Sequence, residues 1–154
     1  MIKLVCFDID GVLTDGCIYV DCAGNEIKKI GLCEIDALND IKKAGYKIAA
    51  LTGENTPITE YFRNKIEWDS FECGCKNKKD RIIELQKNYG INQSEICYIG
   101  DGKYDIEAIS YAGLGVCPDN AIEEVKGVSD IVLKGRGGES CINELCHVLK
   151  SKKV

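Results

Sequence analysis

The sequence has little of what several classes of protein depend on. Its 154 residues contain one histidine, His147, which falls in a C-terminal segment of helical period and is expected at the surface or in an interface rather than in catalysis. The net charge is −5 and no Lys/Arg block is present, which argues against nucleic acid as the main ligand. No apolar run is long enough to cross a bilayer, and residues 1–3 start a strand rather than a signal peptide. We therefore expect a cytoplasmic protein with no membrane partner.

The ten cysteines also lack the spacing of a metal site. No Cys-x-x-Cys pair occurs, and Cys73-Gly-Cys75 has no second pair at zinc-finger distance, which disfavours a thiolate site. Cys6, Cys97 and Cys117 lie inside strand-like runs, where cysteine acts as a small buried apolar residue. Reduced thiols in an intracellular setting are the better interpretation of this cysteine content.

Short apolar segments alternate along the chain with segments of helical period. Strands are expected over 2–9, 47–52, 96–100, 114–117 and 130–134, and helices over 34–44, 56–66, 78–89, 103–112 and 138–150. Helices between buried strands predict an α/β fold with a central parallel sheet and right-handed crossovers. Residues 17–21 and 26–30 flank a turn and predict a β-hairpin inserted after the first strand. No linker, repeat or low-complexity tract appears, so we expect a single domain over 1–154.

Two carboxylates follow the first expected strand. The run reads Asp8-Ile-Asp10-Gly11, directly after four apolar residues. An unpaired buried carboxylate is costly, so a core strand does not end in Asp-x-Asp without compensation. A hard divalent cation such as Mg²⁺ takes oxygen ligands and would supply that compensation. The alternative is a pair of turn-capping aspartates after an ordinary strand.

Other strand ends bring further polar residues to the same edge. The second parallel strand ends in Thr52-Gly53, and Asp101 follows the third. Because ligands bind beyond the carboxyl ends of parallel strands, these groups and the Asp-x-Asp pair are expected to lie together. Three converging strand ends favour a Mg²⁺ site over chance turn caps.

Such a site can carry out phosphoryl transfer. With a cation to shield the phosphate, Asp8 can attack phosphorus and form an aspartyl-phosphate, because it ends the strand and is held most rigidly. Asp10 can protonate the leaving alkoxide and then act as the base toward water. Thr52 and Lys78, the latter at the start of a helical segment, can bind the equatorial oxygens. The alternative for the lysines of 76–79 is a solvated charged face.

These residues carry a family resemblance over nearly the whole chain. The stretch 8–15, Leu51-Thr-Gly53, Lys78 and Gly100-Asp101-x-x-x-Asp105 resemble, in order, the four motifs of the haloacid dehalogenase superfamily of phosphatases. With no inserted cap domain and a hairpin after the first motif, the chain resembles the capless branch that dephosphorylates 2-keto-3-deoxy sugar acids. That branch includes the phosphatases of 3-deoxy-D-manno-octulosonate 8-phosphate and of 2-keto-3-deoxynononate 9-phosphate. The resemblance implies a three-layer Rossmann-like fold.

The resemblance also implies a role for each matching residue. Asp8 would be the nucleophile and Asp10 the general acid and base. Mg²⁺, the implied cofactor, would be held by the Asp8 carboxylate, the Asp10 backbone carbonyl and Asp101. Thr52 and Lys78 would bind the phosphate.

Further implied roles lie outside the reacting atoms. Asp105 would support Lys78 or the metal shell. The implied substrate contacts also include Gly53, Glu54 and the loop Arg136-Gly137-Gly138, which is similar to the branch's Gly-Gly-rich substrate loop. The branch is tetrameric, and its hairpin reaches over a neighbouring subunit's active site, so residues 17–30 would form such a flap here. An isolated two-stranded hairpin is only marginally stable, which agrees with a flap that packs on a partner.

The chain departs from the family pattern at three places. The last motif is usually Gly-Asp-Asp but reads Gly100-Asp101-Gly102 here, so a weaker affinity for Mg²⁺ is expected. Residues 33–37 lack the Arg-Asp-Gly stretch that octulosonate phosphatases commonly carry after the hairpin. Glu54 replaces their arginine and resembles the nononate branch, where it would repel a carboxylate and accept hydrogen bonds from hydroxyls. The alternative for Glu54 is a first-turn helix acid near Pro57.

These features favour a Mg²⁺-dependent phosphatase whose substrate is a phosphorylated sugar acid of the 3-deoxy-D-manno-octulosonate 8-phosphate type. A 2-keto-3-deoxynononate or N-acylneuraminate 9-phosphate is the alternative substrate. Gly102 and the missing Arg-Asp-Gly instead favour a non-catalytic oligomeric module. A receiver-like domain that keeps its aspartyl-phosphate is a third interpretation, disfavoured because Asp10 as a base predicts rapid hydrolysis.

Overall fold

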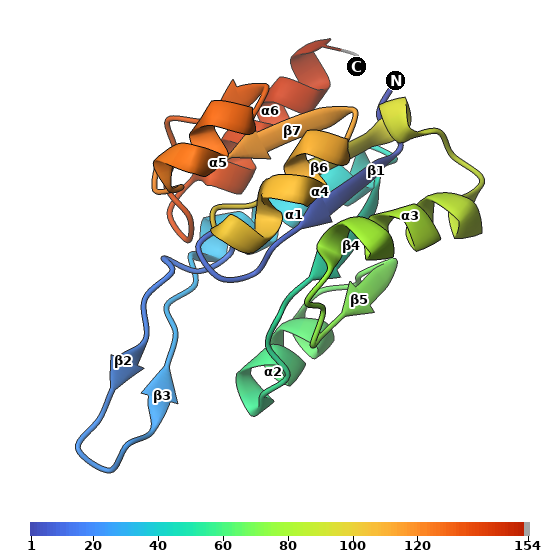
Figure 1. The fold of residues 1–154 in the computed structure, drawn as a ribbon. Coiled ribbons are helices and arrows are strands. Elements are labelled where there is room, and N and C mark those ends of the chain that lie inside the picture. Colours follow the sequence, from blue (N-terminus) through green and yellow to red (C-terminus); the bar gives the residue numbers. More distant parts are fainter. Residues whose placement is uncertain (153–154) are drawn as a thin grey trace.

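A six-stranded parallel sheet forms the centre of the computed structural model, which describes residues 1–152 (Figure 1). The strand order is β5-β4-β1-β6-β7-β8, so the first strand lies in the middle of the sheet. The strands are β1 (Leu4–Phe7), β4 (Lys47–Leu51), β5 (Ser70–Glu72), β6 (Ile96–Ile99), β7 (Leu114–Cys117) and β8 (Ile131–Val132). Every neighbouring pair is parallel, which places all the carboxyl ends at one edge.

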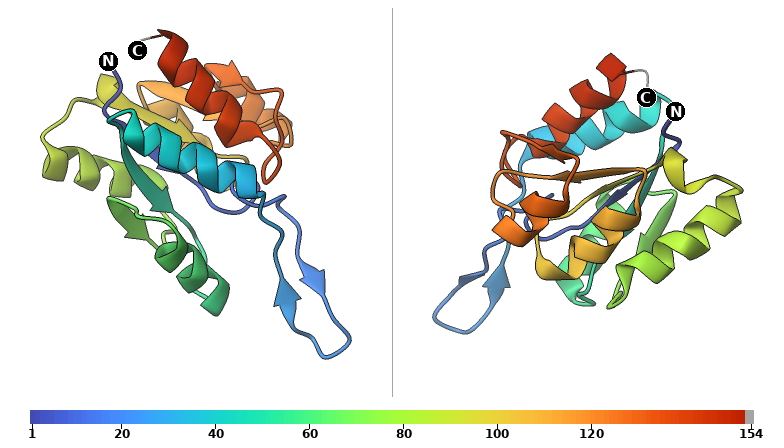
Figure 2. Two further views of the ribbon diagram at one scale, coloured as in Figure 1. Left: turned by 180° about the vertical axis from the view of Figure 1, so that it is seen from behind. Right: turned by 45° about the horizontal axis from the view of Figure 1, so that its top comes forward.

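Helices cover both faces of this sheet (Figure 2). The α-helices are α1 (Leu32–Lys43), α2 (Pro57–Lys65), α3 (Lys78–Tyr89), α4 (Ile106–Tyr111), α5 (Glu123–Val128) and α6 (Cys141–Lys152), with short 3₁₀ turns η1 (Gln93–Glu95) and η2 (Lys103–Asp105). Apolar residues of α1, α2 and α6 pack in one core cluster, and those of α3, α4 and α5 pack in the other. The fold is therefore three layers, helix on sheet on helix.

The pattern of β1 explains both layers. All four of its residues are fully buried, and they alternate between the two clusters. Val5 and Phe7 belong to the cluster with α1 and α6, whereas Leu4 and Cys6 belong to the cluster with α3 and α4. Continuous apolar strands of this kind are typical of a parallel sheet covered on both faces.

The α/β class and the parallel sheet predicted from the sequence are confirmed, with differences at the element ends. The five expected strands are present, several of them shorter than predicted. β5 and α5 were not predicted: β5 is a three-residue edge strand whose residues are only half-buried, and α5 has six residues, too few for a clear helical period. The expected helix over 138–150 begins at residue 141, because residues 135–140 form a loop in which the Arg136 carbonyl accepts three backbone N–H groups. The expected helix over 103–112 starts as the 3₁₀ turn η2 before α4.

A hairpin leaves the body of the molecule between β1 and α1 (Figure 1). Its antiparallel strands, β2 (Tyr19–Val20) and β3 (Glu26–Ile27), are shorter than the expected 17–21 and 26–30. Below them, an isolated bridge between Thr14 and Ile30 closes its base. Apolar side chains on both strands are exposed, with Val20 at 64% and Ile27 at 57%.

The structure leaves all ten cysteines as free thiols. Cys6, Cys97 and Cys117 are buried in the strands, as expected for small apolar residues. His147 is exposed on α6, which agrees with a surface or interface position. Within residues 1–152, no helix is both long enough and apolar enough to span a membrane. The last two residues of the expected domain, 153–154, lie outside the described part.

Candidate active site

The loop after β1 is built around close backbone approaches. Asp8 N–H donates to the Ile99 carbonyl at 3.0 Å, which extends the β1–β6 ladder by one residue. Gly11 follows with φ +80°, and a Cβ there would lie 1.8 Å from Asp101 Oδ2. Thr14 Oγ1 closes the loop by accepting the N–H groups of Gly11 at 3.1 Å and Gly16 at 3.2 Å. Only glycine at position 11 gives both the left-handed backbone and the space for Asp101.

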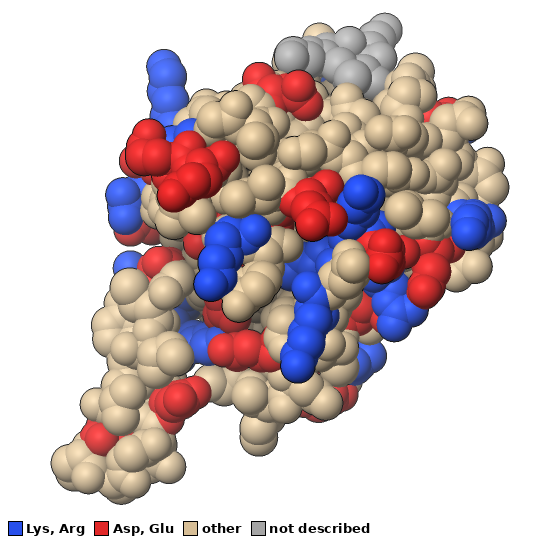
Figure 3. Space-filling view, viewed as in Figure 1, with Lys and Arg blue, Asp and Glu red and all other residues tan. Residues whose placement is uncertain are grey.

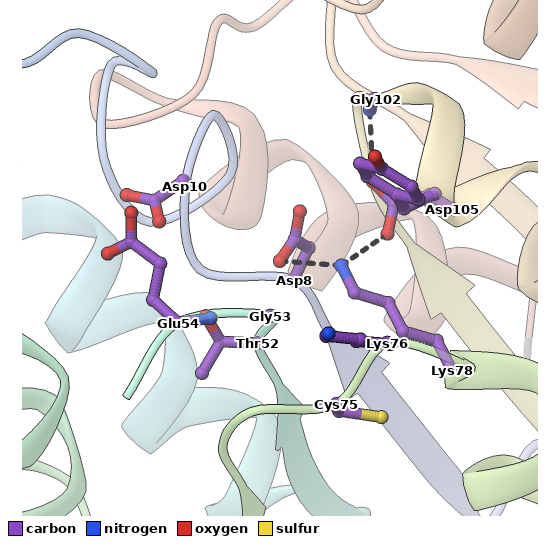
Figure 4. Close-up of a pocket in the computed structure, with 11 residues that line it drawn as sticks. Asp8, Asp10, Thr52, Gly53, Glu54, Cys75, Lys76, Lys78, Gly102 and Asp105 are labelled. Carbon is purple, nitrogen blue, oxygen red and sulfur yellow. Dashed lines mark hydrogen bonds and ion pairs between the residues drawn. The ribbon is translucent and has the colours of Figure 1, made fainter. Parts of the chain in front are cut away.

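Three carboxylates converge beyond the ends of β1 and β6. One oxygen from each of Asp8, Asp101 and Asp105 lies within 4.8 Å of the other two. Lys78 Nζ lies between two of them, 2.8 Å from Asp8 Oδ1 and 2.7 Å from Asp105 Oδ1 (Figure 4). This lysine is buried and is the first residue of α3, where the Asn77 side chain caps the helix by accepting the Asp80 N–H. The cap fixes where the helix starts and so fixes the lysine.

Asp105 is the most fully bonded of these carboxylates. Besides Lys78, it accepts the Tyr98 hydroxyl at 2.6 Å and the backbone N–H groups of Asp101 and Gly102 at 3.0 and 2.9 Å. Burial alone would raise the pKa of Asp105, but the charge and hydrogen bond of Lys78 hold that pKa below its ordinary value. Asp105 therefore lies against Lys78 and the backbone of the Asp101 loop, and its supporting role stays a prediction.

The pKa values of the other two carboxylates, Asp8 and Asp101, are shifted in the opposite direction. Burial and the negative charge of Asp105 raise the pKa of Asp8 well above its ordinary value, although Lys78 opposes the shift. The same two causes raise the pKa of Asp101 to about 7. One ammonium group does not compensate three carboxylates at this depth. The donor set of Asp8, Asp101 and Asp105 is made of carboxylate oxygens, which fits a hard divalent cation such as Mg²⁺.

A cavity of about 510 Å³ opens beside this cluster. Its walls come from the loops after β1, β4, β5 and β6, and they are formed by Asp8, Asp10, Thr52, Gly53, Glu54, Cys75, Lys76, Lys78, Gly102, Tyr104 and Asp105 (Figure 4). Thr52 is buried, and its backbone is held by hydrogen bonds from Thr52 N–H to the Glu72 carbonyl and from Cys75 N–H to the Thr52 carbonyl, both at 2.9 Å. The cavity is of the size that small-molecule sites usually have.

Most of the site residues expected from the sequence lie around this cavity, and one short loop does not. Asp101 does not line the cavity but lies in the carboxylate cluster. The exposed Arg136 side chain pairs with Asp119 at 3.6 Å, away from the cavity walls of this single chain. Gly137 and Gly138 pack against the β1 loop instead. Gly138 N–H donates to the Val12 carbonyl at 3.0 Å, and Gly137 N–H donates at 2.6 Å to Asn120 Oδ1, whose amide nitrogen in turn donates to the Gly11 carbonyl. Within one chain these two glycines support the β1 loop, and substrate contact across an interface stays a prediction.

The structure also corrects the interpretation of Glu54 as a helix acid. α2 begins at Pro57 with Thr56 as its cap, so Glu54 lies outside the first turn. Its carboxylate instead pairs with Lys28, which reaches it from the base of the hairpin.

Four wall or contact residues were missed by sequence reasoning: Lys28, Cys75, Lys76 and Tyr104. Tyr104 lies within the last motif, next to Asp105, and Lys76 lies two residues before Lys78, so their nearness in sequence to motif residues was a usable signal. Lys28 carried no local signal, because its place depends on the path of the hairpin.

Charges of both signs are mixed on the face that carries α3, α4 and α5 (Figure 3). Lys and Arg side chains alternate there with Asp and Glu and form no large patch of one sign in this view. This distribution agrees with the overall net charge of −5.

Comparisons with known proteins agree with the geometry. A family model of haloacid dehalogenase-like hydrolases matches residues 74–137. The 3-deoxy-D-manno-octulosonate 8-phosphate phosphatase of Haemophilus influenzae is 29% identical over 148 residues, which are 96% of this chain and 82% of that protein.

Solved structures show the same relationship. The crystal structure of the 3-deoxy-D-manno-octulosonate 8-phosphate phosphatase from Moraxella catarrhalis, in complex with magnesium, phosphate and a KDO molecule, matches with a TM-score of 0.91 at 30% identity, over 97% of this chain and 87% of that one. A cobalt-bound structure of the Haemophilus influenzae phosphatase matches with a TM-score of 0.90 at 29% identity, over 99% and 90% of the two chains. With these relatives aligned along almost its whole length, the chain belongs to the haloacid dehalogenase-like hydrolases, in the branch that contains the 3-deoxy-D-manno-octulosonate 8-phosphate phosphatases.

Proposed function

We propose that this protein is a Mg²⁺-dependent phosphatase that hydrolyses the phosphate monoester of a 2-keto-3-deoxy sugar acid, of the 3-deoxy-D-manno-octulosonate 8-phosphate type. The observation that carries the proposal is the placement of Asp8, at the end of the central strand, against Lys78 and two further carboxylates. The relatives named as phosphatases of that substrate support its class. So does the Moraxella catarrhalis complex, which contains magnesium, phosphate and the sugar acid.

In the first proposed step, an Asp8 carboxylate oxygen attacks phosphorus. Asp8 Oδ1 is engaged by Lys78 and by the Ile9 N–H at 2.8 Å, so Oδ2 is the oxygen left to attack. Lys78 and the Thr52 hydroxyl bind the phosphoryl oxygens as charge moves onto them. The bond between phosphorus and the sugar oxygen breaks, and Asp10 gives its proton to the departing alkoxide.

In the second step, the aspartyl-phosphate is hydrolysed. Asp10, now ionised, takes a proton from water, whose oxygen attacks phosphorus while the bond to Asp8 breaks. Inorganic phosphate leaves, and Asp8 and Asp10 return to their starting protonation states. The side chains of Asp8 and Asp101 and the backbone carbonyl of Asp10 would hold Mg²⁺, which supplies charge neutralisation for the phosphate and for the carboxylates when it is bound.

The assembly belongs to the same proposal. We propose one domain over 1–154 that forms a homotetramer, with residues 17–30 as a flap against a neighbouring subunit. The exposed apolar residues on both hairpin strands support this, because a projecting hairpin has no core of its own.

A substrate panel tests the function. Wild-type protein with Mg²⁺ is assayed for phosphate release from 3-deoxy-D-manno-octulosonate 8-phosphate, 2-keto-3-deoxynononate 9-phosphate, N-acetylneuraminate 9-phosphate and p-nitrophenyl phosphate. We expect the octulosonate ester to have the highest kcat/KM. A higher value for either nine-carbon ester would move the assignment to that substrate.

Asp8→Asn tests the nucleophile, and Asp36→Asn, at an exposed position on α1, is its matched control. We expect Asp8→Asn to lower kcat by at least about a thousandfold, because the amide does not form the phosphoryl-enzyme intermediate. The control should keep the wild-type rate. Wild-type protein inactive on the whole panel would indicate the non-catalytic module, and a phosphoryl-enzyme that persists for hours would indicate the receiver-like domain.

A further inference from the structure

Lys28 is a residue of the hairpin segment whose ammonium group contacts two residues of the cavity wall. It follows the last residue of β3, and its side chain is only 4% exposed although most of the hairpin around it is open to solvent. Its Nζ lies 2.8 Å from Asp10 Oδ1 and 2.5 Å from Glu54 Oε2. A lysine is almost never buried without partners, so this burial is tied to the two carboxylates.

Both side-chain contacts on the Asp10 carboxylate fall on the same oxygen. Lys28 and the Thr14 hydroxyl both contact Oδ1, at 2.8 and 3.4 Å. Within residues 1–152, no hydrogen-bond donor contacts Oδ2. A group that gives and then takes a proton needs one oxygen at a fixed place and free of other donors. The arrangement leaves Asp10 Oδ2 as that oxygen.

Lys28 also joins two loops that would otherwise repel each other. Asp10 lies after β1 and Glu54 after β4, and both carboxylates are within hydrogen-bond reach of one nitrogen. When Asp10 is ionised, as in the second proposed step, its carboxylate and that of Glu54 would repel each other without Lys28 between them. Lys28 therefore bridges the two loops through its single ammonium group.

We propose that Lys28 is a positioning residue for proton transfer: it fixes the Asp10 carboxylate so that Oδ2 faces the leaving group, and it makes that orientation depend on the seating of the hairpin. This inference rests on the proposed phosphatase function and adds a residue to it. Lys28 acts through Asp10 and does not itself touch the phosphorus.

Lys28→Met removes the charge and keeps most of the chain length, whereas Lys28→Arg keeps the charge. Lys43→Met is the matched control, because Lys43 is an exposed lysine of α1 that lies outside the flap and the cavity wall. Each variant is assayed with Mg²⁺ on the best sugar acid phosphate of the panel and on p-nitrophenyl phosphate. The alkoxide of the sugar needs a proton as it leaves, and nitrophenolate does not. The quantity compared is kcat/KM, which covers binding and the departure of the leaving group.

For Lys28→Met we expect kcat/KM on the sugar acid phosphate to fall by at least about tenfold, mostly through kcat, and that on p-nitrophenyl phosphate to fall by less than about threefold. Lys28→Arg should recover most of the loss, and Lys43→Met should behave as wild type. Equal losses on both substrates, or no loss on either, would overturn the positioning role. A thermal unfolding midpoint of Lys28→Met near that of wild type checks that the variant folds. A wild type inactive on every panel member would instead refute the phosphatase proposal on which this inference depends.

Discussion

Asp101 gives the strongest quantitative test of the carboxylate cluster. In the metal-free protein, burial and Asp105 raise its pKa from 3.8 to about 7. The folded state then binds more protons than the unfolded state, so stability is present at pH 4 and is lost as the pH rises through 7. At about 1.36 kcal/mol per pH unit, the full difference corresponds to about 4 kcal/mol, and partial contact with water reduces it to about 2 to 4 kcal/mol. Asp101→Asn removes this penalty, because the amide has nearly the same shape and no charge.

The assay is thermal unfolding of wild type and Asp101→Asn with EDTA or Mg²⁺, at pH 4.5 and pH 8. In EDTA at pH 8, we expect the variant to melt about 5 to 15 °C above wild type, and at pH 4.5 the difference should be much smaller. Saturating Mg²⁺ should stabilise wild type by about 3 kcal/mol at a hundredfold excess over Kd and should leave the variant unchanged. A variant that melts at or below wild type in EDTA at pH 8, or that Mg²⁺ stabilises equally, would refute this account of the cluster.

Three further substitutions test other parts of the structure. Gly11→Ala places a Cβ 1.8 Å from Asp101 Oδ2 on a backbone with φ +80°. We expect the free energy of unfolding in urea to fall by at least about 2 kcal/mol and the Mg²⁺-dependent activity to fall at least about tenfold. A variant equal to wild type would contradict the close approach. Gly102→Asp places a Cβ 3.9 Å from Asp105 Oδ2, an ordinary contact distance, and adds a carboxylate near the cluster. The Mg²⁺ concentration for half-maximal activity should therefore fall roughly threefold to tenfold, and a rise would contradict the reasoning. Burial raises the pKa of Glu34, so ionising this carboxyl group costs stability as the pH rises above 4.5. In urea unfolding, the stability of wild type relative to Glu34→Gln should therefore decrease from pH 4 to pH 8. A difference that stays constant over this pH range would contradict the raised pKa.

The sequence predicts the centre of the fold better than its edges. β1, β4, β6 and β7 are apolar runs buried on both faces, and such runs have few alternatives in an α/β chain. β5 contains two polar residues in three and exists because its backbone pairs with β4, a contact that no local pattern reports. The hairpin strands were predicted too long because the extent of strand pairing is also not visible in a local pattern. Only two pairs of residues join β2 to β3.

The candidate site divides in the same way. Asp8, Thr52 and Asp101 were predicted to converge because parallel strands bring their carboxyl ends to one edge, and this rule needs only the strand order. Lys78 could be chosen because a helix start fixes its position. Lys28 could not, because its place depends on how far the hairpin base folds back, which is a matter of tertiary packing.

The Lys28 contact changes the argument about which sugar acid this site accepts. Glu54 resembles the nononate branch because that branch has an acidic residue at this place, and an isolated Glu54 at the cavity wall would repel the carboxylate of a substrate. In the structure the Glu54 carboxylate pairs with Lys28, and Lys28 also pairs with Asp10, so the two carboxylates form a network of ion pairs with one ammonium group. Repulsion from such a network is weaker than from a lone carboxylate, because the paired ammonium group offsets part of the negative charge of Glu54. Glu54 is therefore a hydrogen-bond acceptor with a fixed orientation. Its negative charge alone does not decide between eight-carbon and nine-carbon substrates.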